Sequence, residues 1–279
     1  MGRTRTTLVA VAFALVSCSA QATPAATPIQ QVISLRIYTT SETSALLSSL
    51  SAVYRQVNPQ IVFETASGSY DALARRVLRE DGAYFLSHRL PDDIDSPGSR
   101  FWAAPIGQDA LSVIVHPDNT TPGLTLAQLR SVFAGTITRW DALGGPDRAI
   151  DVITPGAGAA LRAEFDSGVM GERRISPTAQ VVPGERAALL SVARQRGAVG
   201  YVSLSALDET VRALPIEGVV PSADSVYDNR YPLRMTIYII GRSEPQEVDY
   251  PDIRAFIGWA QSLEGQQIVA QRYAPLMRP

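Results

Sequence analysis

The sequence predicts an α/β fold, because segments with strand patterns and segments with helix patterns alternate along the chain. Residues 33–38 alternate apolar and polar side chains, as a half-buried strand does. Apolar side chains then recur at helical spacing between Leu46 and Val57, before Asn58-Pro59 ends that pattern. At the other end of the chain, a strand pattern at 235–240 precedes a helical pattern at 253–270.

Between these two ends, the patterns predict three further strands and one further helix. Strands separated by helices favour a sheet with largely parallel pairing. No internal repeat interrupts the order. The strands are predicted at 61–64, 111–115 and 199–202, and the helix is marked by Leu73, Val77 and Leu78.

The first 18 residues have the pattern of an export signal. Arg3 and Arg5 precede an apolar run, Leu8 to Val16, that is far shorter than the roughly 20 residues of a membrane-spanning helix. The run ends in Leu15-Val16-Ser17-Cys18, which resembles a lipobox, where bacterial lipoproteins are cut before a cysteine that then carries lipid. We predict a lipoprotein signal peptide at 1–18 with lipid on Cys18. The alternative is an ordinary signal peptide whose cleavage region includes a cysteine.

Residues 19–32 are predicted to form a flexible tether. From Ser19 to Pro28 the chain contains only Ala, Thr, Ser, Gln and Pro, which cannot bury a core. The folded body is therefore expected to be extracytoplasmic and lipid-anchored to the cell membrane, with no other contact to the lipid.

The composition excludes several classes of protein. Cleavage before Cys18 would leave 23 basic residues, all arginine, against 27 acidic residues, and no basic tract suits nucleic acid. Cys18 is the only cysteine, so no disulfide is expected. The two histidines, His88 and His116, lack metal-ligand neighbours at useful spacing, so neither a metal nor a cofactor is predicted.

Three turns of small or hydroxyl residues precede predicted helices. Helix starts expose unpaired N–H groups, which suit an anion, and hydroxyl side chains add donors. Three such turns in one α/β chain favour a shared oxyanion site. The turns are Thr39–Ser41, Ser67–Tyr70 and Pro155–Arg162.

Each turn also has a structural explanation. Thr39 and Glu42 have the spacing of a capping box, in which the helix satisfies its own first N–H groups. Ser67 and Ser69 are equally explained as turn and cap residues, and Arg162 as a solvent-facing helix residue. Asp109 is expected to have a structural hydrogen-bonding role.

The chain from about residue 34 to 276 resembles the phosphate-binding protein family of ABC transporters. The resemblance implies a two-lobed, type II periplasmic-binding-protein-like fold with two crossover hinge strands. Lobe 1 would comprise 33–104 plus 238–279, and lobe 2 would comprise 105–237 including the hinge strands. The motifs that carry the resemblance are Pro105–Val115, Leu124–Leu129, Val132–Trp140, Gly144-Gly145, Gly197–Val202, Tyr231–Leu233, Glu264–Val269 and Tyr273–Leu276.

The resemblance also implies a binding site. The family's Gly-Ser-Gly-Thr-Arg motif corresponds to Gly158–Arg162, which has lost both hydroxyls but keeps the arginine and the following Phe165. The family's aspartate, which accepts a proton from phosphate, is missing from Ala83–Arg89, so discrimination against sulfate is expected to be lost. The predicted ligand-binding residues are Thr40, Ser41, Ser67, Gly68, Ser69, Gly158, Ala159 and Arg162.

The predicted function is that of a monomeric solute-binding protein, not an enzyme. It would bind phosphate or another small oxyanion and deliver it to an ABC permease. A surface sensor or adhesion protein on the same scaffold is the alternative. A phosphoester hydrolase is less favoured, because the chain has no Gly-x-Ser-x-Gly elbow and no metal cluster.

Overall fold

The computed structural model describes residues 2, 32–243 and 250–278. The chain divides into two units, Met1–Gln31 and Val32–Pro279. Residues 1 and 3–31 lie outside the described residues. The predicted signal peptide, the lipid on Cys18 and the tether therefore stay predictions. Within the described ranges, no helix is both long enough and apolar enough to cross a membrane.

One mixed sheet runs through the unit Val32–Pro279. Its strands follow the order β2-β1-β3-β9-β4-β7-β5-β6, and β8 pairs with β4. The strands are β1 (Ile33–Thr39), β2 (Ile61–Glu64), β3 (Ala83–Ser87), β4 (Phe101–Val115), β5 (Asp151–Pro155), β6 (Gln180–Val182), β7 (Ala198–Ser203), β8 (Arg212–Ala213) and β9 (Arg234–Arg242).

The expectation of largely parallel pairing is wrong for the middle of this sheet. β1 pairs in parallel with β2 and β3, and β5 with β6 and β7. The long strands β4 and β9 pair antiparallel with each other, with β9 also antiparallel to β3 and β4 to β7. The register of β4 and β9 shifts between Pro105 and Gly107, because proline has no N–H to donate to the ladder.

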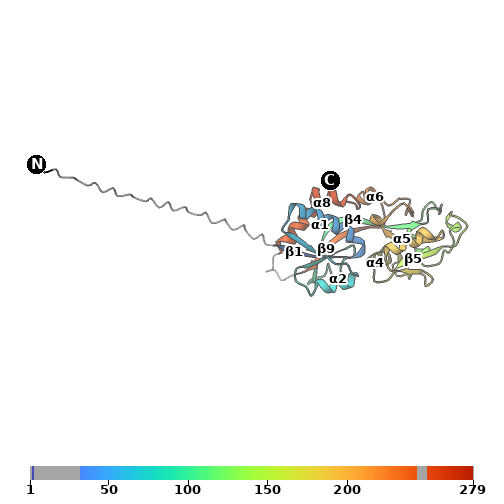
Figure 1. Cartoon of the computed structure of the whole chain (residues 1–279). Coiled ribbons are helices and arrows are strands. Elements are labelled where there is room, and N and C mark those ends of the chain that lie inside the picture. The colour runs from blue at the N-terminus through green and yellow to red at the C-terminus, as the bar shows by residue number, and fades with distance from the viewer. Residues whose placement is uncertain (1, 3–31, 244–249, 279) are drawn as a thin grey trace. The chain divides into compact units, whose positions relative to one another are not determined.

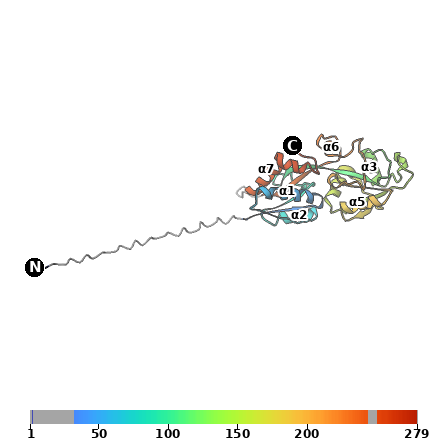
Figure 2. The same cartoon turned by 45° about the horizontal axis from the view of Figure 1, so that its top comes forward.

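The helices gather at the two ends of the sheet. Figures 1 and 2 show α1, α2, α7 and α8 beside β1, and α3, α4 and α5 beside β5, with β4 and β9 running between these groups. The helices are α1 (Ser44–Val57), α2 (Tyr70–Val77), α3 (Leu126–Phe133), α4 (Ala160–Phe165), α5 (Glu185–Arg194), α6 (Ala223–Tyr227), α7 (Pro251–Gln261) and α8 (Leu263–Val269). Four short helical turns complete the order: η1 (Ser41–Thr43), η2 (Asp141–Leu143), η3 (Asp166–Met170) and η4 (Leu204–Ala206).

The single helix predicted at 253–270 is two helices, α7 and α8. Ser262 separates them, with an extended backbone at φ −71° and ψ 169°. Its side chain accepts a hydrogen bond from the Gly265 N–H, which caps α8. Apolar periodicity continues across this break, so the pattern alone could not reveal it.

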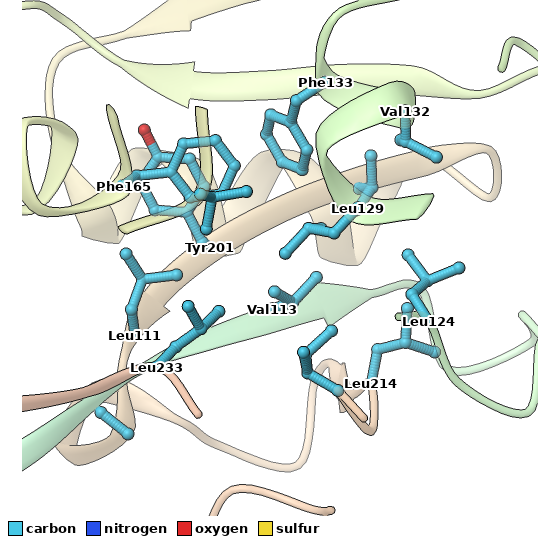
Figure 3. Packing of buried hydrophobic residues seen from close by; sticks show 14 of the residues in the cluster. Leu111, Val113, Leu124, Leu129, Val132, Phe133, Phe165, Tyr201, Leu214 and Leu233 are labelled. Carbon is cyan, nitrogen blue, oxygen red and sulfur yellow. The ribbon is translucent and has the colours of Figure 1, made fainter. Parts of the chain in front are cut away.

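Two large apolar cores lie at the two ends of the sheet. The first combines α1 and β1 with the C-terminal helices, through residues such as Ile37, Leu50, Phe256 and Val269. The second uses residues between Ala110 and Met235, together with Ala274, and Figure 3 shows part of it. Ile106 and Ile237, on β4 and β9, belong to the first core, and the lobe boundaries at 104/105 and 237/238 stay a prediction.

Candidate functional site

A cavity of about 470 Å³ lies where the ends of several elements meet. It contains seven of the eight predicted binding residues and omits Arg162. Its lining combines the segments before α1 and α2 with the segment before α4. The lining residues are Thr40, Ser41, Glu42, Ser67, Gly68, Ser69, Tyr70, Gly156, Gly158, Ala159, Ala160 and Pro183.

Backbone hydrogen bonds hold two of these turns side by side. The Thr39 N–H donates to the Ala66 carbonyl over 2.9 Å, and the Gly68 N–H donates to the Thr39 carbonyl over 3.1 Å. Because β1 and β2 run parallel, their carboxyl ends meet at the same edge of the sheet. The loop after β2 therefore lies beside the loop after β1.

The helix starts at this cavity do not use their side chains as caps. Thr40 precedes η1, Ser69 precedes α2 and Ala159 precedes α4, and none of these side chains accepts a cap hydrogen bond. Ser69 does occupy the N-cap position of α2, as the alternative expected, but its side chain makes no cap hydrogen bond there. A helix start without such a cap leaves its first N–H groups without a partner inside the helix.

The capping box expected between Thr39 and Glu42 does not form. Thr39 is the last residue of β1, and its Oγ1 lies 2.6 Å from Thr43 Oγ1 and donates to the Thr40 carbonyl over 2.8 Å. The Glu42 side chain therefore does not cap the helix start and is instead buried. Glu42 is only 4% exposed, and its Oε2 is buried without a hydrogen-bond partner among the described residues.

Arg162 is held by its own lobe. Its Nε donates to both carboxylate oxygens of Asp166, at 2.9 and 2.8 Å, and its Nη1 lies 3.4 Å from Thr154 Oγ1 and 3.3 Å from the Pro155 carbonyl. The side chain is 17% exposed, so the solvent-facing alternative is wrong. A role in holding an oxyanion stays a prediction. In that role the Arg162 guanidinium would donate hydrogen bonds to both Asp166 and the ligand.

A buried histidine–carboxylate pair joins the end of β3 to the middle of β4. His88, directly after β3, places Nε2 3.1 Å from Oδ2 of Asp109, which lies on β4 and has no exposed surface. Asp109 Oδ1 accepts hydrogen bonds from the N–H groups of Ala110 and Leu204. Burial opposes the charged form of His88, but the bond to Asp109 and the nearby carboxylates of Asp109, Glu42 and Glu164 outweigh it and raise the pKa of the imidazole.

The sequence did not predict that His88 and Asp109 would be hydrogen-bonded to each other. It considered His88 only as a metal ligand and gave Asp109 a general structural role. The one signal is that the family resemblance implies a Ser-Ser-Arg turn at this place, where the chain has Ser87-His88-Arg89, with His88 instead of the second serine. Nothing in the local pattern indicates that Asp109, 21 positions later, supplies the partner.

Two further carboxylates of the second half of the chain, those of Glu164 and Glu185, are partly buried. Burial raises the pKa of Glu185 to about 6, against the lowering effect of a hydrogen bond from the Ser203 N–H, and the charges of Glu42 and Asp109 raise it further. Burial also raises the pKa of Glu164, on α4. Glu185 therefore lies within electrostatic reach of two other carboxylates, those of Glu42 and Asp109.

Glu185→Gln is expected to stabilise the protein by about 2 kcal/mol above pH 6, and hardly at all at pH 4. A carboxyl whose pKa is raised in the folded state contributes stability that is present below its ordinary pKa and is lost as the pH rises through about 6. Glutamine cannot ionise, so it avoids this loss. Urea unfolding at pH 4, 5, 6 and 7.5 measures the difference.

The control for this experiment is Glu209→Gln, which removes a charge from an exposed side chain. Its effect should be small at every pH. A stability difference for Glu185→Gln that is the same at pH 4 and pH 7.5 would contradict the assigned ionisation.

Comparisons with known proteins identify the family and the fold. The PBP superfamily domain matches residues 19–264. Phosphate-binding protein PstS 2 of Streptococcus pneumoniae is 33% identical over 128 residues, which is 43% of each chain, and the Bacillus subtilis PstS is 30% identical over 129 residues, 44% of this chain and 41% of the other. The matches thus span less than half of the length of these relatives.

A substrate-binding protein of Clostridium perfringens, solved with bound phosphate, has the same fold. It superposes with a TM-score of 0.79 at 22% identity, covering 88% of this chain and all of the other. At this identity the likeness shows the fold alone. It confirms the predicted two-lobed, type II periplasmic-binding-protein-like fold.

Proposed function

Since the chain belongs to the PBP superfamily, we propose that it is an extracytoplasmic solute-binding protein of the phosphate or oxyanion type that delivers its ligand to an ABC permease. One observation carries the proposal. The fold gathers the hydroxyl and glycine turns of three separate segments around one cavity, although the first and the last of them lie more than 100 residues apart in the sequence. The curated relatives, named as phosphate-binding proteins, point to the same ligand class.

Binding in such a cavity is non-covalent. Thr40, Ser41, Ser67 and Ser69 supply hydroxyl donors, and the start of α2 supplies backbone N–H groups. The turn at Gly158 and Ala159 adds backbone but no hydroxyl from the opposite side. A ligand that touches both sides favours the closed arrangement of two lobes, because it makes more contacts there than in an open one.

The proposed anchor is a lipid on Cys18, with the protein acting as a monomer. Mass spectrometry of the membrane fraction should then detect a diacylglyceryl-modified cysteine as the first residue of the mature chain. An unmodified Cys18 in a chain that still carries residues 1–17 would exclude this anchor without affecting the proposed binding function.

Phosphate is expected to bind, but about 10³-fold more weakly than to a relative with the complete motif. Two hydroxyls and one carboxylate of the family motif are missing, and each lost partner forfeits roughly 1–3 kcal/mol. Calorimetry with phosphate, sulfate and molybdate measures this directly. Ser67→Ala and Ser69→Ala should weaken binding further, and Ser51→Ala, on α1 and outside the cavity lining, is the matched control.

Two results would contradict this account. If none of the oxyanions binds at millimolar concentration, the proposed ligand class is wrong. If phosphate binds below 1 μM and this affinity survives Arg162→Ala, both the weakened motif and the predicted role of the arginine are wrong.

A further inference from the structure

Asp109 joins the two lobes where β4 passes from the first core to the second. It lies between Ile106, which belongs to the first core, and Ala110, which belongs to the second. Its carboxylate binds the His88 ring, directly after β3 of the first lobe, and the N–H of Leu204, directly after β7 of the second lobe. This bridge has no exposed carboxylate surface, so the lobes touch there through buried polar groups.

Glu185 approaches this bridge from the second lobe. It is the first residue of α5, which packs on β7, and its Oε2 accepts a hydrogen bond from the N–H of Ser203, the residue before Leu204. The charges of Glu42 and Asp109 both act on its carboxyl. Because Glu42 lies in η1, directly before α1 of the first lobe, part of the negative charge around Glu185 comes from the opposite lobe.

A second cavity, of about 580 Å³, brings Glu185 to the space between the lobes. Its walls come from the start of α5 and the segment after β7 on one side, and from Gln271 and Arg272, directly after α8, on the other. Arg186 and Asp208 are the nearest pair of opposite charges in this lining, 3.9 Å apart. In the described part of the chain, no cation forms an ion pair with Glu185, so its charged form has little support.

Glu164 is a second carboxylate of the second lobe that senses the first lobe. It lies on α4, within electrostatic reach of His88 and Arg89, the two residues directly after β3. Both of these are already bonded to other acids, His88 to Asp109 and Arg89 to Asp92. Burial is the larger effect and raises the pKa of Glu164, although the charges of His88 and Arg89 lower it.

Opening the lobes would return these two carboxyls toward water, because the groups of the first lobe that surround them would move away. Each pKa would then fall toward its ordinary value, whereas burial between touching lobes raises the pKa of Glu185 to about 6 and that of Glu164 in the same direction. A carboxyl with a higher pKa in the closed arrangement binds more protons there. Lowering the pH therefore favours closure.

We propose that closing the two lobes takes up protons on Glu164 and Glu185, so that mildly acidic solution favours the closed form and tighter ligand capture. This inference rests on the proposed function, since it assigns a regulation to the same cavity. Loss of the His88 proton at higher pH acts in the same direction, because it weakens the attraction for a charged Glu164. The titratable and charged groups that face the two carboxyls are Glu42, Asp109, Arg186, Asp208, Arg272 and Tyr273 at Glu185, and His88 and Arg89 at Glu164.

Calorimetry with sulfate measures the proton uptake. Sulfate does not titrate between pH 5 and 8, so protons taken up on binding belong to the protein. Titrations of the full chain at pH 5.5, in two buffers of different ionisation enthalpy, should show uptake of roughly half a proton per bound sulfate. The affinity should rise about fivefold from pH 8 to pH 5.

The double variant Glu164→Gln, Glu185→Gln tests whether these residues are responsible. Glutamine does not titrate, so the proton uptake should disappear, and sulfate should bind about fivefold more tightly than to the unmodified chain at pH 8. Glu209→Gln is the matched control, because Glu209 is exposed and lines neither cavity, and it should keep the uptake. Phosphate titrates in this range, so for phosphate the test is the difference between the unmodified chain and the double variant.

Small-angle X-ray scattering of the ligand-free chain gives a second readout. The chain should have a smaller radius of gyration at pH 5 than at pH 8, and the double variant should have the same radius at both. If sulfate or phosphate binds without proton uptake by the protein, or if the uptake survives in the double variant, this inference is overturned while the binding function stands.

Failure of the proposed function would look different. If neither sulfate nor phosphate binds at millimolar concentration, the proposed function fails, and scattering alone then decides this inference, which an equal radius at both pH values would overturn. If the double variant does not fold, proton uptake and scattering of the unmodified chain still decide whether closure is coupled to protonation.

Discussion

Asp109→Ala is expected to lower the free energy of unfolding by about 3–5 kcal/mol, because it removes a buried acceptor and leaves the three groups that bond to it without a partner. The Asp109 carboxylate has no exposed surface and binds His88 through one oxygen. Its other oxygen accepts from the N–H groups of Ala110 and Leu204. Alanine would leave all three donors without an acceptor. The lost acceptor lies on β4, the strand that runs between the two cores.

Urea unfolding of the purified chain measures this loss. Asp147→Ala is the control, since Asp147 is 87% exposed and its ion pair with Arg139 is a surface contact, for which the expected cost is at most about 1 kcal/mol. Asp109→Asn keeps an acceptor oxygen for the two N–H groups and should fall between the two. A cost for Asp109→Ala no larger than that of Asp147→Ala would show that the buried pair does not stabilise the fold.

The strands, helices and binding turns of this protein could be predicted because they depend on short-range patterns. Alternation at 33–38 and apolar periodicity at 46–57 are consequences of backbone geometry, which every strand and helix shares. The turns at Ser67–Ser69 and Gly158-Ala159 were predicted to meet, and the structure places them around one cavity. That prediction came from the small and hydroxyl residues at three helix starts and from the family resemblance, because β2 and β5, the strands before these two turns, do not pair with each other.

The electrostatics of the site could not be predicted in the same way. Glu42, His88, Asp109 and Glu185 come from four distant positions, and each is locally an ordinary polar residue. The raised pKa values of His88 and Glu185 and the unpaired Oε2 of Glu42 arise only when packing brings these groups together. The prediction for Arg162 has the same weakness, because its partner Asp166 lies one helical turn away, and the pattern does not tell whether the guanidinium points toward this acid or the cavity.

Phe165→Ala is expected to destabilise the protein by about 3–5 kcal/mol, since it removes a fully buried ring from the second core. The Phe165 ring stacks on Tyr201 with centroids 4.2 Å apart and an interplanar angle of 2°, and it lies 4.4 Å from the ring of Phe133. Figure 3 shows these three side chains together, contributed by α4, β7 and α3. Deleting the central ring leaves a cavity that two rigid aromatic neighbours cannot fill.

Tyr201→Phe, in the ring that stacks on Phe165, is the matched control for Phe165→Ala. It preserves the stacked ring and removes only the Tyr201 hydroxyl, which lies 2.8 Å from Thr154 Oγ1. Its cost should be about 1 kcal/mol. Thermal and urea unfolding of both variants compares the ring with the hydroxyl, and similar costs for the two would contradict the central packing role of Phe165. Phe165 also ends α4, the helix that begins at the cavity, so Phe165→Ala should weaken phosphate binding at temperatures where the chain is still folded, whereas Tyr201→Phe should leave it nearly unchanged.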